Sequence, residues 1–144
     1  STILNLIKNK KYCLKFKNIK FLCYNPHCGE NNTIGREDFL ISKLIKSNFK
    51  RISGPYPADS AFNQRQNNTL YISTYHDQAL IPIKTLNFDD GVNITLGLPI
   101  VRNSPDHGTA FDIAGKGVAD ATGMRAAMDA ARAIVASDLG SLEI

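Results

Sequence analysis

Short apolar runs alternate along the chain with amphipathic stretches of helical spacing. Residues 19–24, "IKFLCY", and residues 69–75 are apolar, β-branched or aromatic, which is typical of buried strands. "GVNITLGLP" (91–99) predicts a further strand, and "IVRN" a short extended piece after it. Helical spacing of apolar side chains predicts helices over residues 36–47, 77–86 and 123–136. Strands that alternate with helices indicate an α/β fold with a largely parallel sheet.

Turn-forming residues separate these predicted elements. The pair Asn25-Pro26 ends the first strand, and a polar loop follows over residues 27–35. The segment "SGPYPAD" (53–59) is predicted to be a turn-rich connection, because its prolines exclude a regular helix. Pro82 lies inside the predicted helix 77–86, so we expect that helix to start late or to kink.

The composition is 43% hydrophobic and 21% charged over 144 residues, as in one ordinary globular domain. No apolar stretch approaches the ~20 residues that cross a bilayer. The start also lacks the order of a secretory signal, so we expect no membrane partner and a cytoplasmic location. The net charge is +4, but residues 8–20 alone hold six lysines and no acid. This favours a solvated edge over a nucleic-acid surface, and no nucleic-acid-binding motif accompanies it.

The three cysteines, Cys13, Cys23 and Cys28, lack the CxxC spacing of a zinc or redox motif. We expect them to be reduced thiols of a cytoplasmic protein. The chain begins with Ser1 and enters a structured pattern almost at once, so we expect it to be part of a longer polypeptide. We divide it into a basic N-terminal segment, residues 1–18, and a main portion, residues 19–144.

His27 and His76 share one context, because each follows an apolar predicted strand. The carboxyl ends of parallel strands meet at one edge of a sheet, so the two imidazoles could converge there on a divalent metal ion. The alternative is that each histidine is a hydrogen-bonded loop residue. The sequence offers no convincing third ligand, because the remaining histidine, His107, lies in a different kind of loop.

Two aspartates could support a metal site, Asp77 next to His76 and Asp59 in "PADS". Either carboxylate could orient a liganding imidazole. Either could equally cap a helix, and capping is the simpler interpretation for Asp77, which opens a predicted helix.

Three polar side chains are set into apolar runs, where an unpaired polar group would be costly: Lys84, Asn93 and Arg102. A lysine, an amide and an arginine together suit a phosphate or carboxylate, and arginine supplies a bidentate fork. We therefore favour an anion site. The alternative for each is a structural salt bridge or a side chain that reaches to solvent.

The segment "SPDHGTAFDIAGKGVAD" (104–120) predicts a glycine-punctuated loop with one helical turn. Its glycines would let the backbone approach a phosphate closely, and Asp112 could accept hydrogen bonds from a ribose or an adenine. By itself the pattern is weak, because it is neither the GxGxxG fingerprint nor the P-loop.

Four stretches, in this order, resemble the C-terminal half of the 4-hydroxythreonine-4-phosphate dehydrogenase family over about residues 19 to 136. They are "NPHCGE" (25–30), "GPYPAD" (54–59), "YHDQALIPIK" (75–84) and "GVNITLGLPIVRNSPDHGTAFDIAGKG" (91–117). Within the last, "DHGTAFDIAGKG" also resembles the adenosine-binding loop of isocitrate and isopropylmalate dehydrogenases. The resemblance implies a three-layer α/β sandwich of the isocitrate/isopropylmalate dehydrogenase-like type, of which this chain is the C-terminal portion.

The resemblance also implies a metal site and a substrate site. His27 and His76 match two of the three histidines that hold one divalent cation (Zn, Mg or Co) in the family. The third histidine lies upstream, and the site is shared across a homodimer. The family's positions for its small phosphorylated substrate correspond to Lys84, Asn93 and Arg102.

Catalytic and cofactor roles follow in the same way. Asp59 and Asp77 match carboxylates near the substrate's hydroxyl and amine, and together with Lys84 they are the candidates for the proton acceptor. The NAD-binding loop of the wider superfamily corresponds to His107, Gly108 and Asp112. Two departures are Cys28, where the family usually has Ala, and Ala79, where it usually has Gly.

The activity implied by the resemblance belongs to pyridoxal phosphate (vitamin B6) biosynthesis. It is the NAD-dependent oxidation and decarboxylation of 4-phosphohydroxy-L-threonine to 3-amino-2-oxopropyl phosphate. One alternative is a catalytically inactive C-terminal fragment that acts as a binding or dimerisation module. Another is a sister dehydrogenase that acts on a different phosphorylated hydroxy acid.

Overall fold

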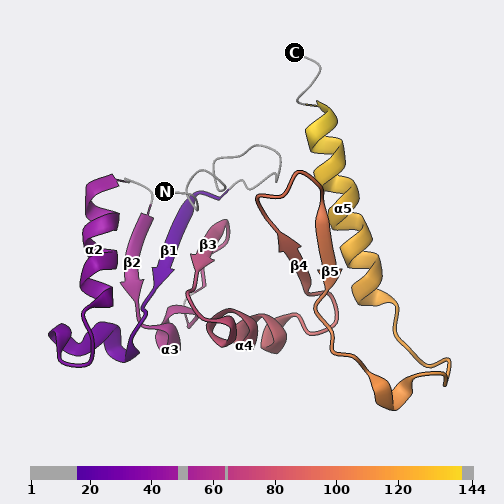
Figure 1. Ribbon diagram of the computed structural model, residues 1–144, viewed down its shortest axis with the longest axis horizontal. Coiled ribbons are helices and arrows are strands. Elements are labelled where there is room, and N and C mark those ends of the chain that lie inside the picture. Colours follow the sequence, from indigo (N-terminus) through magenta and orange to yellow (C-terminus); the bar gives the residue numbers. More distant parts are fainter. Residues whose placement is uncertain (1–15, 49–51, 64, 141–144) are drawn as a thin grey trace. The chain divides into compact units, whose positions relative to one another are not determined.

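The computed structural model describes residues 16–48, 52–63 and 65–140 (Figure 1). These residues form two compact units, and the boundary between them falls after Pro82, inside a helix. Each unit has its own sheet, with three strands in the first and two in the second.

A parallel sheet lies at the centre of the unit that ends at Pro82. Its strands are arranged in the order β2-β1-β3 and comprise β1 (Asn18–Leu22), β2 (Ile52–Tyr56) and β3 (Thr69–Ile72). β1 pairs in parallel with both neighbours, so that Ile19 lies opposite Ile52 and Leu70. The central strand also supplies buried side chains, because Ile19 is 8% exposed and Leu22 is fully buried. The parallel sheet predicted from the alternating pattern is confirmed in this unit.

β2 occupies a segment for which the sequence predicted only a turn-rich connection, and that prediction is wrong. Pro55 excludes a helix but is compatible with a strand at the edge of a sheet, where β2 lies. Gly54 adopts a φ of +126°, and a Cβ there would lie 2.5 Å from the carbonyl oxygen of Phe21. Glycine therefore allows β2 to approach β1 this closely.

Helices connect the strands in the predicted order. α2 (Glu37–Asn48) lies between β1 and β2, and α4 (His76–Leu86) follows β3. α4 begins at His76 although Pro82 lies inside it, so the late start is wrong and the alternative, a kink at Pro82, stays a prediction. Proline there removes the N–H that would bond the carbonyl oxygen of Gln78, and the helix continues despite this loss. Two short helical turns, η2 (Pro26–Asn32) and α3 (Ala58–Ala61), follow β1 and β2.

The buried carboxylate of Asp38 ties the end of β1 to the first turn of α2. Asp38 is 3% exposed and accepts hydrogen bonds from the backbone N–H groups of Tyr24 (2.6 Å) and Asn25 (2.9 Å). The Asn25 carboxamide also donates to Asp38 (3.1 Å) and to Glu37 (2.9 Å). The hydrogen bond from Asn25 holds the pKa of the Glu37 carboxyl below its ordinary value. Three donors thus compensate the burial of one charge.

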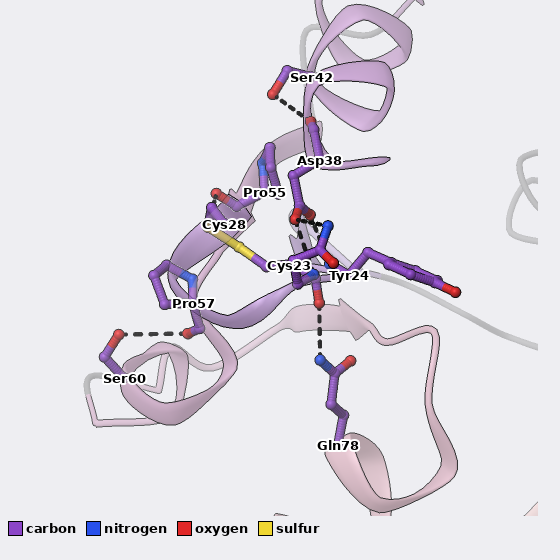
Figure 2. The surroundings of a disulfide bond; sticks show 10 residues. Cys23, Tyr24, Cys28, Asp38, Ser42, Pro55, Pro57, Ser60 and Gln78 are labelled. Atoms are coloured by element: carbon purple, nitrogen blue, oxygen red, sulfur yellow. Dashed lines mark hydrogen bonds between the residues drawn. A yellow bond between two sulfur atoms is a disulfide. The ribbon is translucent and has the colours of Figure 1, made fainter. Parts of the chain in front are cut away.

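Cys23 and Cys28 form a disulfide bond (Figure 2). The expectation of reduced cysteines is therefore wrong at these two positions. The reason is local, because residues 27–31 adopt positive φ values between 41° and 78° and so form a tight left-handed turn. This turn leaves the Cα atoms of the two cysteines 5.1 Å apart, within the range that a disulfide spans. Cys13 lies outside the described residues.

The second unit contains an antiparallel hairpin, which differs from the parallel arrangement that the sequence predicted. β4 (Val92–Thr95) pairs with β5 (Arg102–Pro105), with Thr95 opposite Arg102. The connection of six residues between them is too short for the helical crossover that parallel strands need. The predicted strand 91–99 is accordingly shorter, and its second half belongs to this connection.

α5 (Thr122–Gly140) packs against the hairpin and is longer than the predicted helix 123–136. The Asn103 side chain donates a hydrogen bond to the carbonyl oxygen of Ala127, and both Ala127 and Ile134 are buried. The predicted helical turn in the preceding loop is confirmed as η3 (Phe111–Ile113). Across residues 16–48, 52–63 and 65–140, no helix has the length and apolar character needed to span a membrane.

We predict that Asp38→Ala lowers the free energy of unfolding by about 3 kcal/mol, because it leaves the N–H groups of Tyr24 and Asn25 without their acceptor. Urea unfolding followed by circular dichroism measures the change. Asp129→Ala is the matched control, because this exposed carboxylate forms only a surface pair with Arg132. Its removal should cost less than about 0.5 kcal/mol. Equal losses in the two variants would contradict the anchoring role of Asp38.

Candidate functional site

A cleft of about 520 Å³ lies at the carboxyl ends of all three parallel strands. Segments that follow β1, β2 and β3 each contribute to its wall, as the topology of a parallel sheet requires. The lining residues are Tyr24, Asn25, Pro26, His27, Ala58, Asp59, Tyr75 and Gln78.

Two tyrosines form one wall of the cleft. The rings of Tyr24 and Tyr75 have centroids 5.0 Å apart and are tilted by 43°. Hydrogen bonding to Tyr24 raises the pKa of Tyr75 to about 12, and partial desolvation and the negative charges of Glu37 and Asp38 act in the same direction. At neutral pH Tyr75 is therefore a phenol that can donate a hydrogen bond, and it is a poor general base.

Gln78 fastens the first turns of α4 to the end of β1. Its Nε2 donates a hydrogen bond of 2.8 Å to the carbonyl oxygen of Cys23, as Figure 2 shows. Its Oε1 is buried and has no partner among the described residues. The sequence analysis missed Gln78 together with Tyr24 and Tyr75. Their positions immediately beside the strand ends were the signal that could have identified all three.

The structure places two of the residues predicted for the site, His27 and Asp59, on the wall of this cleft. His27 belongs to the left-handed turn after β1, and Asp59 belongs to α3. His76 and Asp77 open α4, directly after the lining residue Tyr75, and both are exposed. Neither is among the residues that line the cleft. Asp77 lies inside the first turn of α4, which begins at His76, so it is not the N-cap residue of this helix. A carboxylate at this position interacts favourably with the helix dipole.

No group of three or more His, Cys, Asp or Glu side chains within the described ranges is arranged to hold a metal ion. The exposed imidazoles of His27 and His76 are chemically suitable donors for a divalent transition metal. A complete catalytic site has about three protein ligands. A site that uses this pair therefore needs a ligand from outside the described residues.

The hairpin brings two of the predicted anion-binding residues, Asn93 and Arg102, onto one face. Arg102 lies opposite Thr95, and Asn93 is two residues from Thr95 on the same strand, so all three side chains point to the same side. Asn103, the neighbour of Arg102, points to the other side and bonds α5. The Asn93–Arg102 face is therefore directed away from α5 and is exposed at both residues.

The two cations predicted to bind an anion, Lys84 and Arg102, remain available for a ligand. The Arg102 guanidinium donates a hydrogen bond of 2.7 Å to the hydroxyl of Thr95. Lys84 lies in the last turn of α4 and is half-buried. Neither cation forms a salt bridge with any residue that the structure describes. The alternative of a structural salt bridge is therefore not realised within these residues.

The loop predicted to bind a dinucleotide is open. His107 Nδ1 lies 3.0 Å from the carbonyl oxygen of Gly108, and Asp112 belongs to η3. A Cβ built on Gly108, Gly115 or Gly117 would meet no atom within 4 Å. There is therefore free space on the Cβ side of these three glycines.

The family profile described as "Pyridoxal phosphate biosynthetic protein PdxA" matches residues 2–131 of the chain. The 4-hydroxythreonine-4-phosphate dehydrogenase of Paracoccus denitrificans (strain Pd 1222) is 53% identical over 119 residues, which is 78% of this chain and 37% of that protein. The chain thus spans little more than a third of the length of this relative.

Solved structures give the same result for the fold. The 4-hydroxythreonine-4-phosphate dehydrogenase of Klebsiella pneumoniae is 34% identical with a TM-score of 0.60, covering 92% of this chain and 41% of that one. The terephthalate 1,2-cis-dihydrodiol dehydrogenase of Burkholderia xenovorans LB400 is 25% identical with a TM-score of 0.57, covering 88% of this chain and 40% of that one. The match over residues 2–131, together with these relatives, shows that the chain belongs to the PdxA family of pyridoxal phosphate biosynthetic proteins.

Proposed function

We propose that the chain is part of an NAD-dependent 4-hydroxythreonine-4-phosphate dehydrogenase. The enzyme would oxidise and decarboxylate 4-phosphohydroxy-L-threonine to 3-amino-2-oxopropyl phosphate. The observation that carries this proposal is the cleft at the ends of the three parallel strands, with His27 and Asp59 on its wall. The family to which the chain belongs makes this chemistry the first candidate.

His27 and His76 would hold the divalent cation, which we propose to be Zn, Mg or Co. Their suitability rests on two exposed imidazoles in one compact unit. A homodimer with a shared metal site would supply the further ligand. When bound, the cation would act as a Lewis acid on the substrate hydroxyl, and NAD would accept the hydride.

Arg102 and Asn93 would bind the phosphate of the substrate. A guanidinium and an amide on one exposed hairpin face can donate several hydrogen bonds to phosphate oxygens. Thr95 already fixes the Arg102 side chain through its hydroxyl, which lowers the entropy lost on binding. Lys84 would add a second positive charge to the substrate site.

Proton transfer would involve Asp59, Asp77 or Lys84. Asp59 is supported by its place on the cleft wall, and Asp77 by its position next to His76. Tyr75 would line the substrate site as a neutral phenol that is hydrogen-bonded to Tyr24, the interaction that raises its pKa most. Each of these side chains would act from the helix or loop in which the structure places it.

The adenosine end of NAD would bind the loop that contains His107, Gly108 and Asp112. The free space around Gly108 supports this assignment, because a ligand can approach the backbone there. We also keep residues 1–18 as a basic segment distinct from the metal-, substrate- and NAD-binding portion, 19–144. The cytoplasm remains the proposed location, although the Cys23–Cys28 disulfide removes the support that reduced cysteines would have given.

A sister dehydrogenase is the second candidate. The similarity to the dihydrodiol dehydrogenase of Burkholderia xenovorans supports it, because a protein with a different named substrate has the same fold. An inactive binding or dimerisation module is the third, since the chain spans 37% of the Paracoccus relative. Turnover separates these candidates. Activity on 4-phosphohydroxy-L-threonine supports the first candidate, and activity on another phosphorylated hydroxy acid supports the second. The absence of NADH formation with every one of these substrates supports the inactive module.

We predict that His76→Ala lowers the rate of NADH formation by more than about 100-fold, because loss of a metal ligand exceeds the 10–100-fold effect of losing an outer-shell partner. The full-length enzyme that contains this chain is supplied with 4-phosphohydroxy-L-threonine, NAD and a divalent cation, and NADH is followed by absorbance. Arg132→Ala, on the exposed surface of α5, serves as the control. Undiminished turnover in His76→Ala would refute the metal-dependent mechanism.

We predict that Arg102→Ala weakens binding of 4-phosphohydroxy-L-threonine by about 10- to 100-fold, because charge-assisted hydrogen bonds contribute about 1.5–3 kcal/mol. Calorimetric titration measures the affinity without requiring turnover. Binding of 4-hydroxy-L-threonine, which lacks the phosphate, should be unaffected by the same substitution. An equal loss for both ligands would show that Arg102 does not bind the phosphate.

We predict that Tyr24→Phe lowers the pKa of Tyr75 from about 12 towards its ordinary value of 10, because it removes the hydroxyl that contributes most to the shift. Carbon-13 NMR of the tyrosine rings follows the titration. Tyr71→Phe is the control, because this ring packs against Phe62, with a centroid distance of 4.9 Å, and is not part of the cleft wall. A Tyr75 titration that is the same in wild type and Tyr24→Phe would contradict the assignment.

A further inference from the structure

The Cys23–Cys28 disulfide brackets the segment that forms half of the cleft wall. The four residues between the two cysteines, 24–27, all line the cleft. Figure 2 shows the disulfide beside the carboxylate of Asp38 and the carboxamide of Gln78. The disulfide thus closes a covalent ring, and residues 24–27 of this ring line the cleft.

The two ends of this ring are held unequally. On the Cys23 side, the Cys23 carbonyl oxygen accepts from Gln78, and the next two backbone N–H groups donate to Asp38. On the Cys28 side, the backbone N–H of Cys28 donates only a 3.2 Å bond to Asn25, inside the same ring. Its Sγ lies 3.6 Å from the carbonyl oxygen of Pro55.

The Cys28 side also has a costly backbone conformation. His27 and Cys28 adopt φ values of 50° and 54°, in the left-handed region that non-glycine residues seldom occupy. Such a conformation persists only where other interactions enforce it. Here the disulfide is the covalent constraint that closes the turn.

From these observations we infer that Cys23 and Cys28 form a reversible thiol–disulfide site whose state sets the position of His27 in the cleft. The reaction partners are small-molecule thiols and disulfides of the glutathione class. Cys28 is the point of attack, because it is half-buried whereas Cys23 is 1% exposed. This inference stands apart from the proposed enzymatic function, because its thiol chemistry requires no turnover.

The exchange is balanced in two steps. A thiolate of the small thiol attacks Sγ of Cys28, forms a mixed disulfide and displaces Cys23 as a thiolate, which takes up a proton. A second small thiolate then attacks the mixed disulfide, releases Cys28, and leaves as the oxidised small disulfide. Two electrons pass from the two small thiols to the protein, and the reverse sequence restores the bond.

Reduction should act on one end of the segment only. The hydrogen bonds of Asp38 and Gln78 persist, so Tyr24, Asn25 and the end of β1 keep their positions. The turn that carries His27 loses its covalent closure. The cleft should therefore change at His27 while its tyrosine wall remains.

The test combines thiol counting with amide exchange in a Cys13→Ser background. Alkylation and intact mass should find no free thiol after equilibration with oxidised glutathione and two free thiols after reduction with dithiothreitol. Amide hydrogen exchange, followed by NMR, should then accelerate about tenfold or more on reduction at Cys28 and Ile34, whose N–H groups bond within this turn. The amides of Tyr24 and Asn25, bound by Asp38, should change by less than about twofold.

Cys28→Ser supplies the control, because it cannot form the bond and leaves the buried Cys23 in place. It should show the fast exchange of the reduced protein under both conditions. Free thiols at both positions in oxidised glutathione would overturn the inference, as would a bond that resists dithiothreitol in the folded protein. Equal exchange rates at Cys28 in the two states would also overturn it, because the bond would then not constrain the turn.

Discussion

The buried Asp38 carboxylate is the interaction on which the strand-end cleft depends. The central strand β1 ends at Leu22, and the N–H of Cys23 still bonds the carbonyl oxygen of Tyr56 in β2. The backbone N–H groups that follow leave the sheet and need other acceptors. Asp38 accepts from two of these groups, and its place in the first turn of α2 puts its charge at the favourable end of the helix dipole. The course of the chain from β1 to His27 is thereby fixed to α2.

The same carboxylate also acts on the tyrosine wall of the cleft. The negative charges of Glu37 and Asp38 disfavour the phenolate of Tyr75 and help to raise the pKa of Tyr75. The cleft therefore presents neutral hydrogen-bond donors next to an imidazole and a carboxylate. A polar, hydroxyl-bearing ligand suits such a wall better than an anion does. The proposed phosphate site is instead the Asn93–Arg102 face, where the guanidinium bonds Thr95 and forms no salt bridge with the described residues.

The sequence predicted those parts of the fold that local pattern determines. β1 is an apolar run and α5 an alanine-rich periodic segment, and both lie where the pattern places them. β2 was missed because its pairing with β1 depends on Gly54. The close approach of Gly54 to Phe21 exists only in the folded sheet and leaves no local pattern in the sequence. The Cys23–Cys28 bond was missed for a similar reason, since a left-handed turn, and not a spacing motif, brings the cysteines together.

For the site, position at a strand end was informative and side-chain chemistry alone was not. His27 was predicted from its place after a strand, and it reaches the cleft wall. Asp59 also reaches the wall, but it was proposed as a carboxylate partner and from the family resemblance, because the strand before it was missed. Tyr24, Tyr75 and Gln78 occupy equivalent places but have no acid–base or metal-binding signature in the sequence. The sequence did not predict that the side chains of Asn93 and Arg102 lie on one face of the hairpin. This placement follows from the antiparallel register, which the sequence analysis did not expect.

The distribution of apolar side chains bears on how the proposed site would be completed. Phe39, Leu40 and Leu44 of α2 are each more than half exposed, and Ile81 of α4 is 67% exposed. Burying such side chains stabilises a protein by about 1.5–3 kcal/mol each, so exposed apolar helical faces of this kind commonly mark surfaces that another segment covers. The proposed metal site of His27 and His76 is also incomplete. The described residues provide two imidazoles for it, whereas a catalytic site takes about three ligands. Both features support the proposal that further polypeptide, from the same subunit or a second one, completes the packing and the coordination together.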